Sequence, residues 1–137
     1  QTPNPKPQTP KPLGSQFNLL EHVGLFILLI CIVASVNFLT EITSNLATTS
    51  IVLPILIPLA YMLDIHPYIL MIGATIAASC AFMLPVATPP NAIVFGSGVI
   101  KMNEMIKVGF WLNIISIIIL TLITYYLVPI VFDLSQI

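Results

Sequence analysis

Charged side chains are scarce in this sequence. Only 7% of its 137 residues are charged, and four lysines, no arginine and five acidic residues leave a formal net charge of −1. So few cations cannot neutralise a row of phosphates, which excludes nucleic-acid binding. Soluble globular domains carry about 25% charged residues, so the composition also excludes an ordinary soluble domain.

Residues with catalytic or metal-binding chemistry are equally sparse. Cys31 and Cys80 lie singly among apolar residues, without a Cys-x-x-Cys spacing or a histidine placed to complete a metal site. The sequence contains no Gly-x-Ser-x-Gly or His-Glu-x-x-His motif, and its two histidines lie at the edges of apolar blocks. We therefore expect neither an enzyme nor a cofactor.

Long apolar blocks dominate the chain. Hydrophobic residues make up 58% of it and the mean hydropathy is +1.05. The blocks cover residues 19–39, 46–63, 68–100 and 108–132. A helix needs about 20 apolar residues to cross a bilayer, so the pattern predicts an all-α, multi-pass integral membrane protein.

The first 18 residues differ in composition from the rest. Residues 1–18 begin with alternating proline and polar residues and are expected to form an extended polar tail. Residues 19–137 then form the membrane segment. Because the sequence shows neither a signal peptide nor an initiating methionine, we expect the C-terminal piece of a longer protein.

The first two apolar blocks are joined by a very short polar break, residues 40–45. Two arrangements are consistent with it. Either two full spans are joined by an external turn, or a re-entrant hairpin has a tip that stops midway through the membrane. The lysines do not decide between them, because Lys101 and Lys107 lie opposite the tail lysines in both arrangements.

The third block is too long for one straight span and contains a proline cluster. Pro85, Pro89 and Pro90 withdraw backbone donors and clash with the preceding helical turn. Backbone groups freed in hydrocarbon are costly unless protein, water or an ion satisfies them. The sequence therefore predicts a broken helix over residues 68–100 whose interruption lines a cavity. A continuous terminal helix is predicted over residues 105–132.

Both breaks place helix ends inside the membrane. Ser44 or Asn45 can cap a new helix after the first break, and Thr88 can cap one after the second. Free N–H groups and the positive end of a helix dipole attract an anion there. The helices that end before each break leave carbonyl oxygens without intrahelical partners, and such oxygens suit a cation such as sodium. Discontinuous helices of this kind recur in secondary transporters.

Two sequence runs also resemble signatures of a known family. Residues 38–49, FLTEITSNLATT, and residues 78–92, ASCAFMLPVATPPNA, are similar to the two C-terminal signatures of the divalent anion:sodium symporters. The resemblance implies a sodium-coupled carrier of dicarboxylates, citrate or sulfate. It also implies two inverted repeats and a homodimer that works by elevator-type alternating access. This chain would then be a fragment, the end of the second repeat, with a re-entrant helical hairpin at residues 19–63.

The family's site residues, carried onto this sequence, fall at the two breaks. The resemblance implies that sodium is bound by Thr40, Thr43, Asn45 and the Ala87 carbonyl, and a substrate carboxylate by Ser44, Asn45, Thr88 and Pro89. Leu46 stands where the signature has threonine, so one hydroxyl is lost. Glu41 is an ionisable group at the tip, but a capping or solvated carboxylate is equally consistent, and it is not among the predicted ligands.

The first repeat of the family is absent from these residues. The expected partners are therefore the remaining half of the transporter, sodium as coupling ion, a small divalent anion and the lipid of a plasma or inner membrane. The alternative is a non-transporting structural membrane subunit or an inactive fragment. That alternative fits the composition but does not require two polar breaks at membrane depth.

Overall fold

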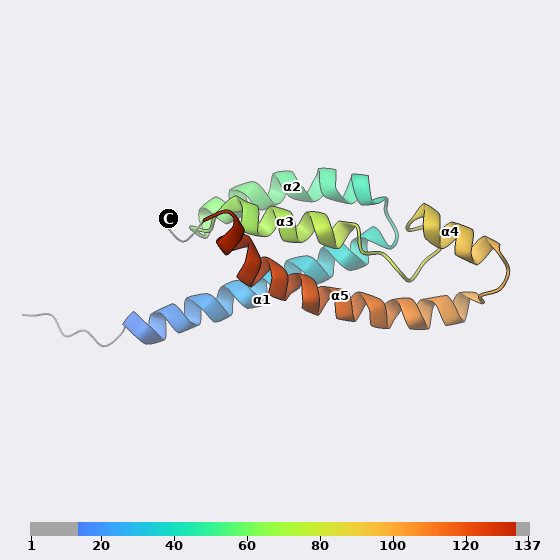
Figure 1. Ribbon diagram of the computed structural model, residues 1–137. Coiled ribbons are helices and arrows are strands. Elements are labelled where there is room, and N and C mark those ends of the chain that lie inside the picture. The colour runs from blue at the N-terminus through green and yellow to red at the C-terminus, as the bar shows by residue number, and fades with distance from the viewer. Residues whose placement is uncertain (1–13, 134–137) are drawn as a thin grey trace, which may run out of the picture.

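Five α-helices follow one another along the part of the chain that the structure, a computed structural model, describes, residues 14–133 (Figure 1). They are α1 (Gly14–Thr40), α2 (Asn45–Met62), α3 (Pro67–Ala78), α4 (Pro89–Gly96) and α5 (Met102–Val131). The described range contains no strand, as the predicted all-α class requires. Three helical stretches, Leu20–Thr40, Asn45–Met62 and Met102–Val131, are long and apolar enough to cross a membrane.

Two helix starts differ from the prediction. Helix α1 begins at Gly14, so residues 14–18 belong to it and not to the predicted tail, whose first 13 residues lie outside the described range. The last proline of the tail is Pro12, and residues 13–18 can all donate a backbone N–H. Helix α5 begins at Met102, earlier than predicted, because the Lys101 N–H donates to the Glu104 carboxylate at 3.2 Å and so holds the first turn.

Of the two predicted caps of the second helix, Ser44 and Asn45, the structure has Ser44. Ser44 has an extended backbone and its Oγ accepts the Ala47 N–H at 3.1 Å. Helix α2 continues through Pro54 and Pro58, which lie inside it. At the other end of α2, a short turn leads to α3, which His66 caps by accepting the Tyr68 N–H at 3.3 Å.

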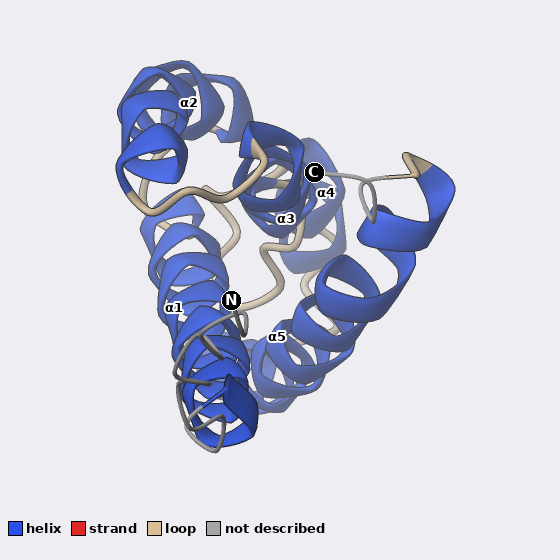
Figure 2. Cartoon of the chain, turned by 90° about the vertical axis from the view of Figure 1, so that its left-hand side faces the viewer, coloured by secondary structure: helices blue, strands red, loops and turns tan. Residues whose placement is uncertain are grey.

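Helix α3 is the centre of the packing. It lies between α1 and α2 and also contacts α5, which packs against α1 in turn (Figure 2). The shared core is formed by residues such as Leu29 and Val33 of α1 and Leu70 and Ala77 of α3, all with 0% exposure. Because α3 fills the space between α1 and α2, the two arms of the predicted hairpin splay apart and touch each other over a small area.

A glycine lets α5 approach the interruption between α3 and α4 closely. A Cβ atom placed on Gly109 would lie 2.3 Å from the Phe82 carbonyl oxygen and 2.6 Å from the Met83 Cα. Real side-chain carbons do not come this near to backbone atoms, so only glycine fits here. The backbone of α5 therefore forms one wall of the interrupted region.

Candidate functional site

The broken helix predicted from the proline cluster is present. Helix α3 ends at Ala78, α4 begins at Pro89, and residues 79–88, named the break from here on, are not helical. Within the break a tight turn around Pro85 is closed by the Ala87 N–H, which donates to the Leu84 carbonyl at 3.2 Å. The interruption was predicted at residues 85–91, but it begins earlier, at Ser79, and it ends at Thr88 because Pro89 and Pro90 form the first turn of α4.

Asn91 of α4 satisfies two of the carbonyls that the break sets free. Its Nδ2 donates to the Ala81 carbonyl at 2.9 Å and to the Leu84 carbonyl at 3.1 Å. These bonds hold the start of α4 against the break and lower the cost of interrupting a helix in an apolar environment. The sequence prediction included Asn91 in a signature but gave it no role.

The turn between α1 and α2, residues 40–45, is named the tip from here on. Thr40 is fully buried there, and its Oγ1 lies 2.8 Å from Asn45 Oδ1 and 2.8 Å from the Ala78 carbonyl oxygen. A hydroxyl carries one hydrogen, so it can donate to only one of these two oxygens at a time. The three oxygens therefore share this one hydrogen, and neutral oxygens of this kind are ligands that hard cations take.

The other two predicted hydroxyls at the tip have structural partners. Thr43 Oγ1 donates to the Leu39 carbonyl at 2.9 Å and lies in hydrogen-bond contact with the buried Thr48 Oγ1. Ser44 Oγ holds the first turn of α2. The N–H groups of Asn45 and Leu46 precede the first intrahelical bond of α2 and stay open to an external acceptor, while the Leu46 side chain is 79% exposed.

Thr88 lies at the N-cap of α4 as predicted, but its hydroxyl does not cap the helix. Its backbone is extended, with φ −143° and ψ 150°, and no side-chain capping bond is formed. Pro89 and Pro90 occupy the first helical positions and have no N–H. The start of α4 therefore offers an anion its helix dipole and the Thr88 hydroxyl, with fewer backbone donors than α2.

Glu41 is the residue that the structure adds to the two breaks and that the predicted ligands did not include. It is only 3% exposed, and its carboxylate accepts backbone N–H groups from Phe82, Met83 and Leu84 at 2.8–3.2 Å. It also accepts from Asn113 Nδ2 of α5 at 2.7 Å. The tip and the break are joined through this one side chain. The available signal in the sequence was an ionisable residue in an apolar segment.

The contact with Asn113 also indicates the depth of the tip. Asn113 is 11 residues from the start of α5, which corresponds to about 16 Å along a helix at 1.5 Å per residue. A helix long enough to span the bilayer thus meets the tip well inside its length. This supports the re-entrant arrangement, which stays a prediction because α1 and α2 are each long enough to cross.

The predicted ligands are brought together in part. Thr40 and Asn45 meet directly, and the tip reaches the end of α3 at Ala78 and the break at residues 82–84. Ala87 closes the Pro85 turn and Thr88 follows it, and among the hydrogen bonds of residues 14–133 none joins them to Ser44 or Asn45. The pocket shared by Asn45 and Thr88 stays a prediction.

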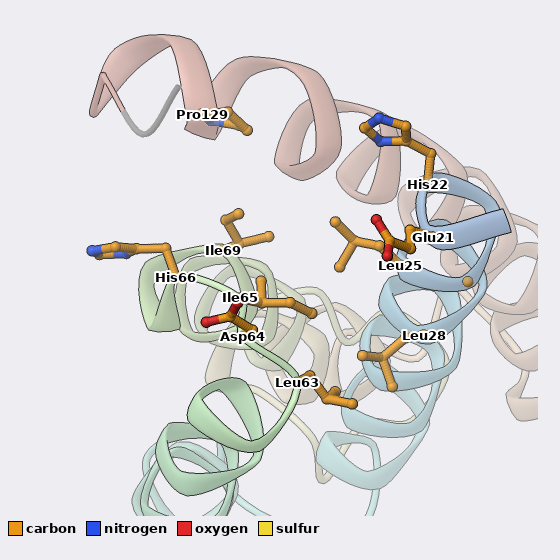
Figure 3. A pocket seen from close by; sticks show the side chains of 11 residues that line it. Glu21, His22, Leu25, Leu28, Leu63, Asp64, Ile65, His66, Ile69 and Pro129 are labelled. Carbon is orange, nitrogen blue, oxygen red and sulfur yellow. The ribbon is translucent and has the colours of Figure 1, made fainter. Parts of the chain in front are cut away.

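A separate cavity of about 860 Å³ lies at the opposite end of α1, α2 and α3 (Figure 3). Its polar lining comes from Glu21 and His22 of α1 and from Asp64 and His66 near the turn before α3. Both histidines have structural partners, since His22 Nδ1 lies 3.1 Å from the Tyr125 hydroxyl and His66 caps α3. None of the predicted site residues lines this cavity.

Comparison with known proteins decides the family. The family model described as the sodium:sulfate symporter transmembrane region matches residues 13–132. The chain belongs to this family. The match and the three apolar helices make it part of a multi-pass membrane protein.

Curated relatives of this symporter-family chain are named as transporters. It is 51% identical over 117 residues to the sodium-dependent dicarboxylate transporter SdcS of Staphylococcus saprophyticus, covering 85% of the chain and 22% of that protein. It is 51% identical over 126 residues to SdcS of Staphylococcus aureus strain MRSA252, covering 90% of the chain and 24% of that protein. The chain thus spans about a quarter of the length of these relatives.

Proposed function

We propose that the chain forms part of a secondary active transporter that couples sodium entry to the uptake of a divalent organic anion. The observation that carries this proposal is the oxygen cluster of Thr40, Asn45 and the Ala78 carbonyl, buried at the end of α1. Sodium bound there replaces the missing hydrogen-bond donor. Membership of a sodium:sulfate symporter family supports the choice of cation.

In this proposal the anion binds beside the cation, at the start of α2 and α4. The open N–H groups of Asn45 and Leu46 and the α2 dipole face a carboxylate, and the Thr88 hydroxyl binds it from the other side. Sodium ordering the tip raises the affinity for the anion, and the anion raises the affinity for sodium equally, because linkage is reciprocal.

A dicarboxylate is the anion that we propose, ahead of citrate and sulfate. The relatives that match most of the chain are named dicarboxylate transporters. Since the chain spans about a quarter of their length, the complete carrier requires the remaining half of the site, and we propose that it works as a homodimer. A non-transporting structural subunit is the less favoured alternative, because it does not explain why polar oxygens are gathered at the buried end of α1.

Uptake by the complete carrier in proteoliposomes tests the proposal. We expect succinate to accumulate when an inward sodium gradient is present and to stop accumulating when potassium replaces sodium. Citrate and sulfate are measured in parallel to separate the three anions. No uptake of any of the three anions, with or without sodium, would favour the structural subunit.

Thr88→Val is expected to weaken anion binding while the fold is kept. Valine has the shape of threonine and tolerates the extended backbone of this position, and the hydroxyl that it removes does not cap α4. Losing one hydrogen bond to a charged group corresponds to an increase of about tenfold in the anion concentration that gives half-maximal uptake. Thr75→Val, on the exposed face of α3, is the matched control and should leave uptake unchanged.

A further inference from the structure

We infer that Glu41 is a positioning residue that fastens the tip to the break and thereby holds the proposed sodium ligands in place. The inference rests on the proposed sodium coupling for its functional part. Its structural part rests on the hydrogen bonds of one buried carboxylate. Glu41 follows Thr40 directly in the chain, so the position of its carboxylate fixes the position of the oxygen cluster.

Both oxygens of the Glu41 carboxylate are used. Oε1 accepts from the Phe82 N–H at 2.8 Å, the Met83 N–H at 3.0 Å and Asn113 Nδ2 at 2.7 Å. Oε2 accepts from the Met83 N–H at 3.2 Å and the Leu84 N–H at 3.0 Å. Three successive backbone N–H groups pointing to one place form a concave anion site. Here the anion is a side chain of the protein itself.

This arrangement has two consequences for the site. First, the N–H groups of residues 82–84 are not available to a substrate carboxylate, which leaves the starts of α2 and α4 for the anion. Second, the N–H groups of Phe82, Met83 and Leu84 are all paired with the Glu41 carboxylate, so this part of the break is held in place although it has no helical hydrogen bonds. The tip and the break then move as one unit.

Glutamine is the substitution that tests whether the carboxylate holds the break by accepting hydrogen bonds or only fills space. Glu41→Gln keeps the size of the side chain but replaces one acceptor oxygen by an NH₂ group, which faces the N–H donors of the break. Glu41→Asp keeps the charge and withdraws it by one methylene, so it reaches fewer of the donors. Glu21→Gln, at an exposed glutamate of α1, the helix that leads into the tip, is the matched control.

The experiment has two readouts in the complete carrier. The first is the rate at which a membrane-permeant maleimide labels Cys80, which lies half-buried at the start of the break, with Cys31 and all other cysteines replaced by serine. The second is the sodium concentration that gives half-maximal succinate uptake. The labelling rate requires only inserted protein and reports on the break whether or not the carrier transports.

For Glu41→Gln we expect the Cys80 labelling rate to rise about tenfold, because several hydrogen bonds to a charged group are lost. The half-saturating sodium concentration should rise by about tenfold or more, as for other supports of ion ligands. Glu41→Asp should give intermediate values and Glu21→Gln none of these changes. The aspartate variant decides the outcome if the glutamine variant does not accumulate in the membrane.

Two results would overturn the inference. Unchanged Cys80 labelling in both Glu41 variants would show that the carboxylate does not hold the break. Faster labelling with an unchanged half-saturating sodium concentration would show that it holds the break without positioning the ligands. A parent carrier that shows no sodium-dependent uptake contradicts the proposed function alone, and the labelling rates then still decide whether the tip is fastened.

Discussion

Gly109→Ala is expected to abolish sodium-dependent uptake and to destabilise the packing of α5 on the break by about 3 kcal/mol. The added Cβ would lie 2.3 Å from the Phe82 carbonyl oxygen and 2.6 Å from the Met83 Cα. Both are backbone atoms, so no flexible side chain can move aside. The break must shift, and the N–H groups that bind the Glu41 carboxylate shift with it.

The comparison that isolates this effect is Gly24→Ala. Gly24 lies within α1, and a Cβ placed on it meets nothing within 4 Å. Alanine is the better helix former by about 1 kcal/mol, so this control should be neutral or stabilising. Thermal unfolding in detergent and succinate uptake are measured for both variants. Equal melting temperatures and uptake rates for the two would show that α5 does not press on the break.

Asn45→Ala is expected to weaken the response to sodium and to the anion together. The Asn45 side-chain oxygen lies 2.8 Å from Thr40 Oγ1 in the oxygen cluster, and its backbone N–H is at the open start of α2. Removing the side chain takes one ligand from sodium and loosens the tip that presents the N–H groups. Because the two sites are linked, both half-saturating concentrations should rise by about tenfold.

Asn103→Ala serves as the control for this variant, since Asn103 is an exposed asparagine in the first turn of α5. Alanine at position 45 does not remove the cap of α2, which Ser44 supplies, so helix insertion should be normal. Uptake is measured over a series of sodium concentrations at a fixed succinate concentration, and over a series of succinate concentrations at a fixed sodium concentration. A change in anion affinity alone would mean that Asn45 does not belong to both sites.

Local properties of the sequence determined the helices and their interruptions. Apolar blocks long enough for the bilayer predicted the spans, the proline cluster predicted the break after α3, and Ser44 predicted the start of α2. Each of these follows from a residue acting on its own neighbourhood, through a missing N–H or a capping hydroxyl. The starts of α1 and α5 lie a few residues earlier than predicted. Helix α1 begins just after Pro12, and α5 begins where the Lys101 N–H donates to the Glu104 carboxylate.

Only the tertiary structure decided what the breaks contact. Glu41 is 72 residues away from Asn113 in sequence, and the two meet because α1, which ends just before Glu41, packs against α5. The other partners of Glu41 are backbone N–H groups. Almost every residue has one, so no pattern of side chains in the sequence could predict these contacts. The same holds for Gly109, whose role is defined by a carbonyl that lies against it only after the helices have packed.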